Sequence, residues 1–240
     1  MPKRSGSGSN RFPVNISILY EDSDILVVVK PVGLLTIGTE RDKSRTLYAL
    51  LTDYVRKGYP KSPNRIFIVH RLDRDTSGIL VFAKSMEAKL RLQGQWEETE
   101  KEYSAVVHGR CTQMERTITT YLAENKARLV YSTPDTTKGK LSHTAYRVLT
   151  ATKEFSLLEV NLLTGRKHQI RVHLAEIGHP VVGDRKYGKV KETYKRLALH
   201  AKAISFIHPL SGKRLAFETA SPEYFNKLVG SKEQRNAVRG

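Results

Sequence analysis

The sequence predicts an α+β fold, in which a mostly antiparallel mixed β-sheet forms the core and helices flank it. Two observations favour this fold class. Segments with the composition of β-strands outnumber segments with helical spacing, and many strand-like segments follow one another directly along the chain. A chain of 240 residues, of which 39% are hydrophobic, is also long enough to bury a sizeable core.

Strand-like and helical segments alternate in the first hundred residues. Residues 25–29 are a β-branched run that ends at a turn over residues 30–33, which predicts a strand. Residues 46–57 have helical spacing, and so do residues 85–98, where Ser85 can cap the helix N-terminus. We expect Leu47, Leu50, Leu51 and Tyr54 to share the apolar face of the first helix, and Met86, Leu90 and Gln93 or Gly94 to share a stripe of the second.

The rest of the chain is richer in strands. We expect strands at residues 101–108, at two segments between residues 145 and 163, and at the antiparallel pair 197–207 and 214–219. Residues 112–142 are polar and contain Pro134 and Gly139, which predicts a hairpin with a long loop. Two helices complete the prediction: one over residues 168–177, stopped by Gly178 and Pro180, and a last one with Ser221 as N-cap and Pro222 at its first position.

Charge is the main compositional clue to a partner. Forty-one Lys and Arg against 24 Asp and Glu give a net charge of +17, which is typical of proteins that bind nucleic acid. No apolar run is long enough to cross a membrane, and no signal peptide is evident, so we expect a cytoplasmic protein with no membrane partner. The single Cys111 is expected to be a small packed side chain. We expect one folded domain over residues 12–230, acting as a monomer, between a disordered basic tail (1–11) and a polar tail (231–240).

The most informative segment is residues 70–78, His-Arg-Leu-Asp-Arg-Asp-Thr-Ser-Gly, which lies between strand-like runs at residues 66–69 and 79–83. The polar turn carries an acid, Asp73, between Arg71 and Arg74. Nearby guanidinium groups favour the ionised form of a carboxylate, and two buried strands would fix its direction. The pattern therefore indicates a rigidly held carboxylate, although a surface turn with a salt bridge would have the same composition.

Several ordered motifs resemble those of the RluA-type pseudouridine synthases. Residues 70–78 match that family's His-Arg-Leu-Asp-x-x-Thr-Ser-Gly at every fixed position, and the resemblance spans roughly residues 17–227. One departure is that the chain has too few residues before Tyr20 for the N-terminal S4-type RNA-binding module that many relatives carry. The other matching motifs are Lys30-Pro31-Val32-Gly33-Leu34, Lys101-Glu102-Tyr103, Leu-Thr-Gly-Arg-Lys-His-Gln-Ile-Arg-Val-His at 163–173, Gly178-His179-Pro180, Gly183-Asp184 and Leu197–Ala201.

The resemblance implies that the protein isomerises specific uridines in structured RNA to pseudouridine, with ribosomal RNA the first expectation and transfer RNA the second. The reaction needs no redox step and no group donor, so no cofactor is expected. Asp73 stands at the family's catalytic aspartate, Arg171 resembles the arginine that pairs with it, and Arg166 is the fallback for that role. Tyr103 resembles the tyrosine that packs on the target base, where its alternative role is that of a core strand residue.

A uridine inside a helix must be flipped out before an enzyme can reach it. Arg71 resembles the residue that fills the vacated space, and the alternative is that it forms a salt bridge within the turn. Leu199 resembles the apolar residue at the pocket floor, and the alternative is that it is an ordinary buried leucine of a strand. The remaining candidates for RNA binding are basic residues in or beside the motifs: Arg74, Lys138, Lys140, Arg166, Lys167 and His168.

Two other classes of function remain to be separated. A non-catalytic RNA-binding or ribosome-assembly factor on the same fold would show the same basic charge, but it would have no use for an acid among phosphates. A metal-dependent nuclease would need clustered ligands. His168 and His173 lie five residues apart, about 140° from a common helix face, and no third ligand at metal spacing is evident, so no metal site is expected. We expect His70 to be a hydrogen-bonded structural residue.

Overall fold

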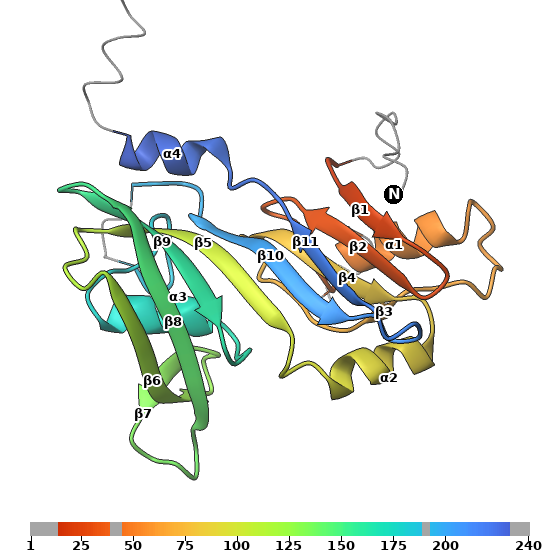
Figure 1. The fold of residues 1–240 in the computed structure, drawn as a ribbon, viewed down its shortest axis with the longest axis horizontal. Helices are drawn as coiled ribbons and strands as arrows, with labels where there is room; N and C mark the ends of the chain where they lie inside the picture. The colour runs from red at the N-terminus through yellow and green to blue at the C-terminus, as the bar shows by residue number, and fades with distance from the viewer. Residues whose placement is uncertain (1–13, 39–44, 189–192, 231–240) are drawn as a thin grey trace, which may run out of the picture. The chain divides into compact units, whose positions relative to one another are not determined.

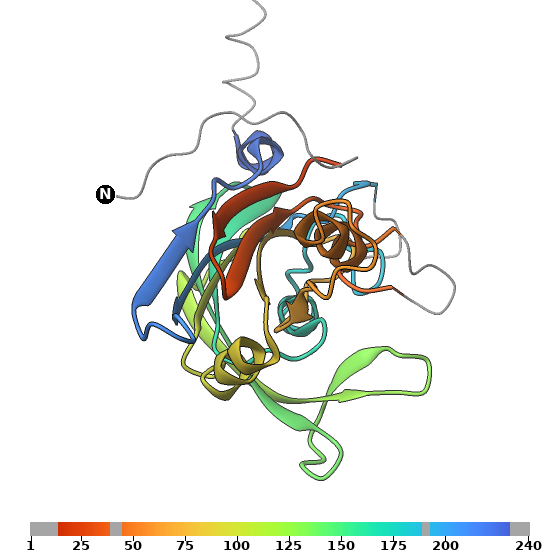
Figure 2. The same ribbon diagram turned by 90° about the vertical axis from the view of Figure 1, so that its right-hand side faces the viewer.

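The structure is a computed structural model that describes residues 14–38, 45–188 and 193–230. The two tails predicted from the sequence lie outside the described residues. The chain divides into two compact units, Met1–Gln93 and Gly94–Gly240, and each is described by itself. Figures 1 and 2 show the strands and helices of both units.

The first unit is built on the antiparallel strands β1 (Ser17–Glu21), β2 (Ile25–Lys30) and β4 (Ser77–Ala83), in the order β1-β2-β4. A short strand, β3 (Phe67–Ile68), pairs with the end of β4. The strands predicted at 25–29, 66–69 and 79–83 are thus confirmed. Every residue of β4 is buried, and this explains why β4 shows no polar alternation in the sequence.

Helix α1 (Leu47–Val55) begins after Thr46, whose hydroxyl accepts a hydrogen bond from the Ala49 amide at 3.1 Å. Its buried residues include Leu47, Leu51 and Val55, spaced four apart, whereas the predicted Leu50 and Tyr54 are only half-buried.

Helix α2 (Met86–Gly94) has the predicted Ser85 cap, since the Ala88 amide donates to Ser85 Oγ at 3.0 Å. The predicted stripe, however, is wrong. Met86 and Leu90 are 48% and 61% exposed, and the helix buries Ala88 and Leu92 instead. The pattern favoured large apolar side chains, but a small alanine allows closer packing, and single exposed apolar residues are common.

The second unit holds an antiparallel sheet in the order β11-β10-β5-β9-β8-β6-β7. The strands predicted at 101–108, 145–163, 197–207 and 214–219 are confirmed. Their bounds are β5 (Glu100–His108), β6 (Glu115–Glu124), β7 (Val130–Thr133), β8 (Lys140–Ala151), β9 (Phe155–Leu162), β10 (Leu199–Ile207) and β11 (Arg214–Glu218).

The region 112–142 is more ordered than the sequence predicts. It contains β6, β7 and the start of β8, which extend away from the rest of their sheet in Figures 1 and 2. The predicted long loop is therefore mostly strand. Threonine and tyrosine in β6 favour strands although they are polar, and this explains why the segment reads as a loop by hydropathy alone.

Helix α3 (Gln169–Glu176) packs on one face of this sheet. The Thr144 hydroxyl lies 3.0 Å from His173 Nδ1 and 2.9 Å from Gln169 Nε2. Residues two apart on a strand share a face, so Tyr146 points the same way as Thr144. Through the strand register, Val160 and Tyr103 point to that side as well.

Helix α4 (Glu223–Val229) buries Phe225 and Val229 in the core of the second unit. The prediction that Ser221 caps this helix is wrong, because Pro222 occupies the cap position and Ser221 Oγ lies 2.7 Å from Ser104 Oγ. The serine hydroxyl thus ties the helix start to β5. Among the described residues, no helix is long and apolar enough to cross a membrane.

Candidate active site

The loop that carries Asp73 is fastened at both ends within the first unit. His70 Nε2 accepts a hydrogen bond from the Val81 amide at 3.0 Å, as its predicted structural role requires. The Thr36 hydroxyl donates to the Leu72 carbonyl at 2.8 Å and accepts from the Leu72 amide at 3.3 Å. Asp73 itself is half-buried. The structure therefore presents this carboxylate from a loop whose backbone is fixed on both sides.

A buried lysine lies beneath the same loop. Lys30 Nζ donates to the carbonyl oxygens of Pro31 (3.0 Å), Leu34 (2.8 Å) and Arg74 (3.0 Å), and the residue is fully buried. An ammonium group has three donors, so this geometry satisfies all of them. The Arg74 carbonyl directly follows Asp73 in the chain, and Lys30 thereby holds the backbone at the position that aims the carboxylate.

Burial lowers the pKa of Lys30 to about 8, against the opposing attraction of the Asp75 and Asp73 carboxylates. The group is therefore predominantly an ammonium ion at neutral pH. Sequence reasoning included Lys30 in a motif but gave it no role. The residues around Lys30 do not indicate that it is buried, because one of the carbonyls that it binds lies 44 residues further along the chain.

The two arginines that flank Asp73 in sequence lie at the surface of the loop. Arg74 Nε donates to Asp75 Oδ1 at 3.1 Å, in an ion pair whose side chains are largely exposed. Arg71 is exposed. The Arg74 guanidinium thus bonds to the neighbouring acid, Asp75.

Tyr103 and Leu199 share one face of the sheet in the second unit. Tyr103 on β5 pairs with Ala201 on β10, and Leu199 pairs with Ala105, so the two side chains are diagonal neighbours on that face. Leu199 is buried in the hydrophobic core, and the half-buried Tyr103 packs against the same core. Helix α3, which carries Arg171, covers this side of the sheet, so three predicted site residues of the second unit belong to one side.

Arg171 makes a two-pronged contact that sequence reasoning missed. Its Nε donates to Asp184 Oδ2 at 2.7 Å and its Nη2 donates to Asp184 Oδ1 at 2.8 Å. Burial raises the pKa of Asp184, but the hydrogen bond and charge of Arg171, together with the amides of Tyr187 and Lys186, hold it below its ordinary value. The Asp184 side chain is wholly buried, so the pair is a fixed ionic support for the guanidinium.

Tyr187 is a second support that the sequence did not reveal. The Arg171 guanidinium lies 5.2 Å from the centre of its ring, within cation–π range. The Tyr187 hydroxyl lies 2.7 Å from His168 Nδ1 and accepts a hydrogen bond from the Val130 amide at 3.1 Å. His168 precedes α3 with a left-handed backbone (φ 54°). Tyr187 thus contacts β7, the residue before α3 and Arg171. In the sequence, only the nearby Gly183-Asp184 motif indicated that this segment belongs to the site.

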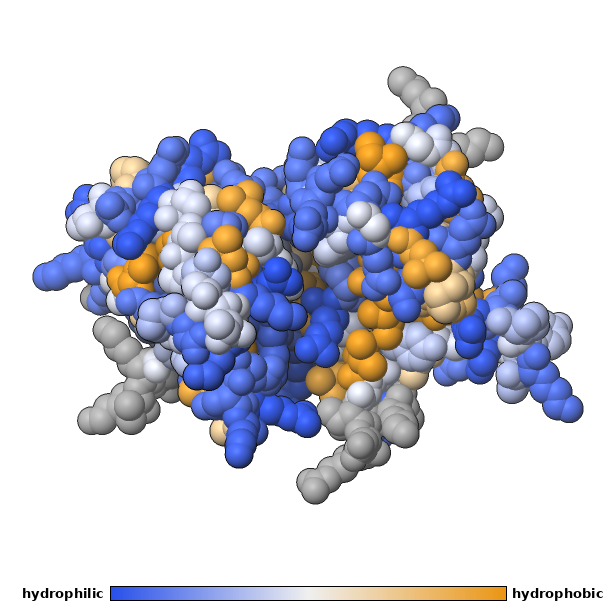
Figure 3. All heavy atoms as spheres, turned by 90° about the horizontal axis from the view of Figure 1, so that it is seen from below, coloured by the Kyte–Doolittle hydropathy of each residue, from blue (hydrophilic) through white to orange (hydrophobic). Residues whose placement is uncertain are grey.

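The other predicted RNA-binding residues of the second unit are basic side chains that are ion-paired or exposed. Lys138 pairs with Asp135 at 2.8 Å and Lys167 pairs with Glu124, so both cations already have acidic partners. Lys140 and Arg166 are exposed. In the face drawn in Figure 3, hydrophilic side chains predominate and hydrophobic ones are interspersed. Lys138, Lys140 and Arg166 are accessible to a polyanion, but the ion pairs reduce the charge that Lys138 and Lys167 offer.

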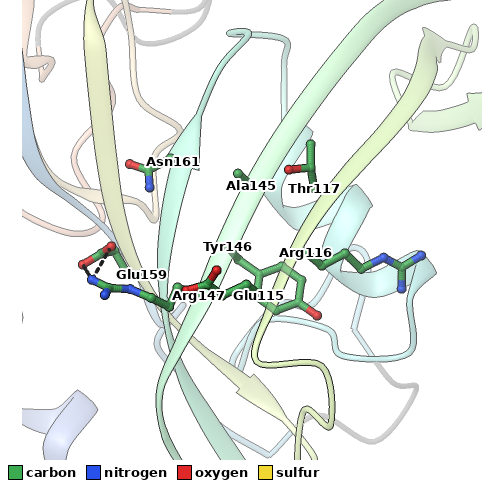
Figure 4. A pocket seen from close by; sticks show the side chains of 8 residues that line it. All are labelled: Glu115, Arg116, Thr117, Ala145, Tyr146, Arg147, Glu159 and Asn161. Carbon is green, nitrogen blue, oxygen red and sulfur yellow. Dashed lines mark hydrogen bonds and ion pairs between the residues drawn. The ribbon is translucent and has the colours of Figure 1, made fainter.

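A separate hollow of about 510 Å³ opens on β6, β8 and β9 (Figure 4). Arg147 lies in register between Glu115 and Glu159, and it pairs with Glu159 at 3.0 Å. These residues alternate with Thr144 and Tyr146 and so face away from α3. None of the predicted site residues lines the hollow, and we do not assign the reaction to it.

Comparison with known proteins identifies the same family as the motifs. The family model of RNA pseudouridylate synthases matches residues 24–176. The chain is 35% identical over 226 residues to ribosomal large subunit pseudouridine synthase D of Zymomonas mobilis subsp. mobilis, covering 88% of this chain and 70% of that protein. It is 36% identical over 224 residues to ribosomal large subunit pseudouridine synthase C of Buchnera aphidicola, covering 85% and 68%.

Solved structures agree on the fold. Human RNA pseudouridylate synthase domain containing 1 aligns with a TM-score of 0.72 and 27% identity, covering 98% of both chains. Human RNA pseudouridylate synthase domain containing 4 aligns with a TM-score of 0.73 at 22% identity, covering 87% of this chain and 90% of that one. The predicted α+β fold class is confirmed.

Proposed function

Because this chain belongs to the RNA pseudouridylate synthase family and isomerises uridine in RNA, we propose that Asp73 is its catalytic residue. The observation that carries the assignment is the anchoring of the loop. The backbone on both sides of Asp73 is bonded to Thr36 and to the buried Lys30, while its carboxylate stays half-exposed. A reactive group must be held in a fixed direction and must remain reachable, and this loop meets both requirements.

The isomerisation moves one bond and needs no external reagent. The bond from ribose C1′ to uracil N1 breaks, the base turns, and C1′ is joined to C5, while C5 loses its proton and N1 takes one up. Asp73 can assist by adding to the sugar, by adding to the base or by removing a ribose proton, and every one of these roles requires the ionised carboxylate. We propose that no metal or organic cofactor takes part.

Arg171 is our candidate for the cation that pairs with Asp73. Asp184 accepts hydrogen bonds from its Nε and Nη2 and so holds the guanidinium in a fixed orientation. A guanidinium that a buried acid already holds loses little freedom when it pairs with a second one. Arg166, the fallback, is exposed, and this favours Arg171 for an oriented contact.

The remaining roles concern the flipped base. We propose that Tyr103 stacks on the uracil and that Leu199 forms the apolar floor, because both side chains share one face of the second unit's sheet. Arg71 is exposed and can occupy the space that the base leaves in the RNA. Arg74, Lys138, Lys140, Arg166, Lys167 and His168 are our candidates for contacts to the RNA backbone.

We propose ribosomal RNA as the substrate, since relatives with 35% and 36% identity are named ribosomal large subunit pseudouridine synthases. Transfer RNA is the second candidate. We further propose that the enzyme acts as a cytoplasmic monomer on a structured RNA with a flipped-out uridine.

Release of tritium from C5 tests the assignment of Asp73. RNA transcribed with 5-tritiated uridine is incubated with the protein in the presence of EDTA, and Asp73→Asn is compared with Asp75→Asn. Asp75 is the matched control because it lies on the same loop and pairs with the exposed Arg74. Asp73→Asn should lose activity by several orders of magnitude, whereas Asp75→Asn should remain within about tenfold of the wild type.

The outcomes separate the candidate functions. A folded Asp73→Asn protein that keeps more than about a tenth of the activity would show that another group performs the chemistry. If the protein binds RNA but releases no tritium from any tritiated RNA that is tested, a non-catalytic binding factor would be favoured. Release that stops in EDTA would favour a metal-dependent reaction.

A further inference from the structure

The segment that joins α1 to β3 is an exposed basic loop. Residues 56–65, Arg-Lys-Gly-Tyr-Pro-Lys-Ser-Pro-Asn-Arg, contain four cationic residues and no acidic one. In their middle stands Tyr59, which at 73% exposure is the most exposed large hydrophobic side chain in the part of the chain that the structure describes. We name residues 56–65 the Tyr59 loop. None of the roles proposed above uses it.

The Tyr59 loop is ordered by its own hydrogen bonds. The Tyr59 amide donates to the Arg56 carbonyl at 3.0 Å, and the Ser62 amide donates to the Tyr59 carbonyl at 2.9 Å. Arg56 Nε donates to the Asn64 carbonyl at 3.3 Å, which links the two ends. Lys57 and Gly58 adopt left-handed backbone conformations (φ 52° and 79°) and reverse the chain just before Tyr59. The ring is therefore displayed on a preformed turn.

The chemistry of the loop fits single-stranded RNA. An aromatic ring that lies outside the core offers a stacking surface for an unpaired base, and every base has a face that can stack. Lys57, Lys61 and Arg65 are exposed around it and can bind the flanking phosphates. A protein partner would be expected to meet a broader apolar patch, whereas this loop surrounds one ring with prolines and cations.

The position of the loop in the chain relates it to the proposed reaction. Arg65 lies eight residues before Asp73, within the same unit. Eight residues span at most about 29 Å, which equals roughly eight steps along a stacked strand at about 3.4 Å each. An RNA that presents its uridine to Asp73 can thus reach Arg65, the near end of the Tyr59 loop, with a flank of about eight nucleotides.

We propose that the Tyr59 loop is an accessory RNA-binding site, in which Tyr59 stacks on an unpaired base of the substrate's single-stranded flank and the surrounding cations hold its phosphates. The proposal rests on the proposed function in one respect, namely that the substrate is RNA. It adds a recognition element outside the pocket and predicts a preference for RNA whose target stem-loop has an unpaired flank.

The test uses the full chain and a fluorescein-labelled RNA of twelve adenosines, which has no uridine to enter the active site. Fluorescence anisotropy at about 50 mM salt, where phosphate contacts are strong, gives the dissociation constant for the wild type, Tyr59→Ala and Tyr59→Phe. Loss of one stacked base should weaken binding by roughly 5- to 150-fold in Tyr59→Ala, whereas Tyr59→Phe keeps the ring and should remain within about twofold. Leu90→Ala is the matched control, because Leu90 is another highly exposed apolar side chain of the same unit.

A second readout separates this proposal from the catalytic one. Tyr59→Ala should release tritium from a stem-loop without a flank at the wild-type rate, and should show a raised KM only when a flank of about ten nucleotides is added. Asp73→Asn should bind the twelve-adenosine RNA as the wild type does.

Three results would overturn the proposal. One is equal binding by the wild type and Tyr59→Ala, or no binding by either. Another is that a Lys57→Gln, Lys61→Gln double variant binds the RNA more weakly while Tyr59→Ala has no effect, which would show that the loop contributes only unspecific charge. The third is unchanged RNA affinity together with abolished binding to phosphatidylserine vesicles in Tyr59→Ala, which would assign the loop to a lipid surface.

Discussion

Replacement of Lys30 by methionine is the most direct test of how the Asp73 loop is held. Methionine has a similar length but no donor, so the carbonyls of Pro31, Leu34 and Arg74 each lose a partner. Hydrogen bonds to a charged donor contribute roughly 1.5–3 kcal/mol each, so the three together contribute about 4.5–9 kcal/mol. The pKa of Lys30 is lowered from 10.5 to about 8, which corresponds to a net cost of roughly 3 kcal/mol for the charged form, burial outweighing the attraction of Asp75 and Asp73, and the variant no longer bears this cost. We expect a net loss of roughly 1–6 kcal/mol in the free energy of unfolding at pH 7.

The pH dependence of this difference provides a sharper measurement. Between pH 8 and 10.5 the unfolded chain holds the Lys30 proton more tightly than the folded chain does, because the folded pKa is the lower one. Stability must then rise with pH across this window and stay at its lower level below pH 8. Relative to Lys30→Met, which has no group to titrate there, the wild type should gain roughly 3 kcal/mol between about pH 7.5 and 10.5.

Urea unfolding of both proteins at several pH values measures this difference, since the other titrating groups are common to both. Lys61→Met is the control, because Lys61 is exposed in the same unit and should show neither the loss nor the slope. Tritium release should fall at least about tenfold in kcat for Lys30→Met with KM little changed, because the Arg74 carbonyl next to Asp73 keeps only its bond from the Gly33 amide. A pH-independent difference, or a variant as stable and active as the wild type, would refute the anchoring role.

Three further outcomes can be checked with the same preparations. Asp184→Asn removes one partner of a buried ion pair, so the free energy of unfolding, measured by heat or urea, should fall by roughly 3–5 kcal/mol. The kcat should also fall, because Arg171 loses its support, and a variant with wild-type stability and kcat would contradict this. Replacing Lys138 and Lys140 by glutamine should weaken cognate and unrelated RNA alike and reduce the log–log salt slope by about 0.7 for each phosphate that is no longer neutralised, so an unchanged slope in a salt titration would exclude both residues from phosphate binding. Activity should survive dialysis against EDTA without ATP or nicotinamide, and tritium release that required added metal would reject the cofactor-free reaction.

The fold could be predicted where apolar patterning decides the structure. Strands β2 and β4 are continuous apolar runs, and Ser85 caps its helix as the sequence indicates. Prediction failed where packing overrides hydropathy. Strand β6 is rich in threonine, has charged residues at its two ends and reads as a loop, although its pairing with β8 makes it a strand.

The site could be predicted only as a set of residue types. The motifs singled out Asp73, Tyr103 and Arg171, but they did not reveal what holds these residues. Lys30 bonds to a carbonyl 44 residues away, and Asp184 meets a guanidinium 13 residues away. Such partners depend on how the chain folds back on itself, and no local spacing encodes them. The left-handed backbone of His168, which caps α3, is equally invisible in the sequence.

The buried ionic supports and the exposed cations should affect the enzyme in different ways. Lys30 and Asp184 are buried, and each acts on the backbone or guanidinium that positions a proposed catalytic group. Loss of either must reduce stability, since it leaves buried polar groups without partners, and must also reduce kcat, since it releases the group that was positioned. Lys140 and Tyr59 are exposed and support no catalytic group, so their loss should raise KM or weaken RNA binding while stability and kcat are preserved. If the Lys140 or Tyr59 variants lost stability or kcat, or the Lys30 or Asp184 variants changed only KM, RNA binding and catalytic positioning would depend on the same interactions.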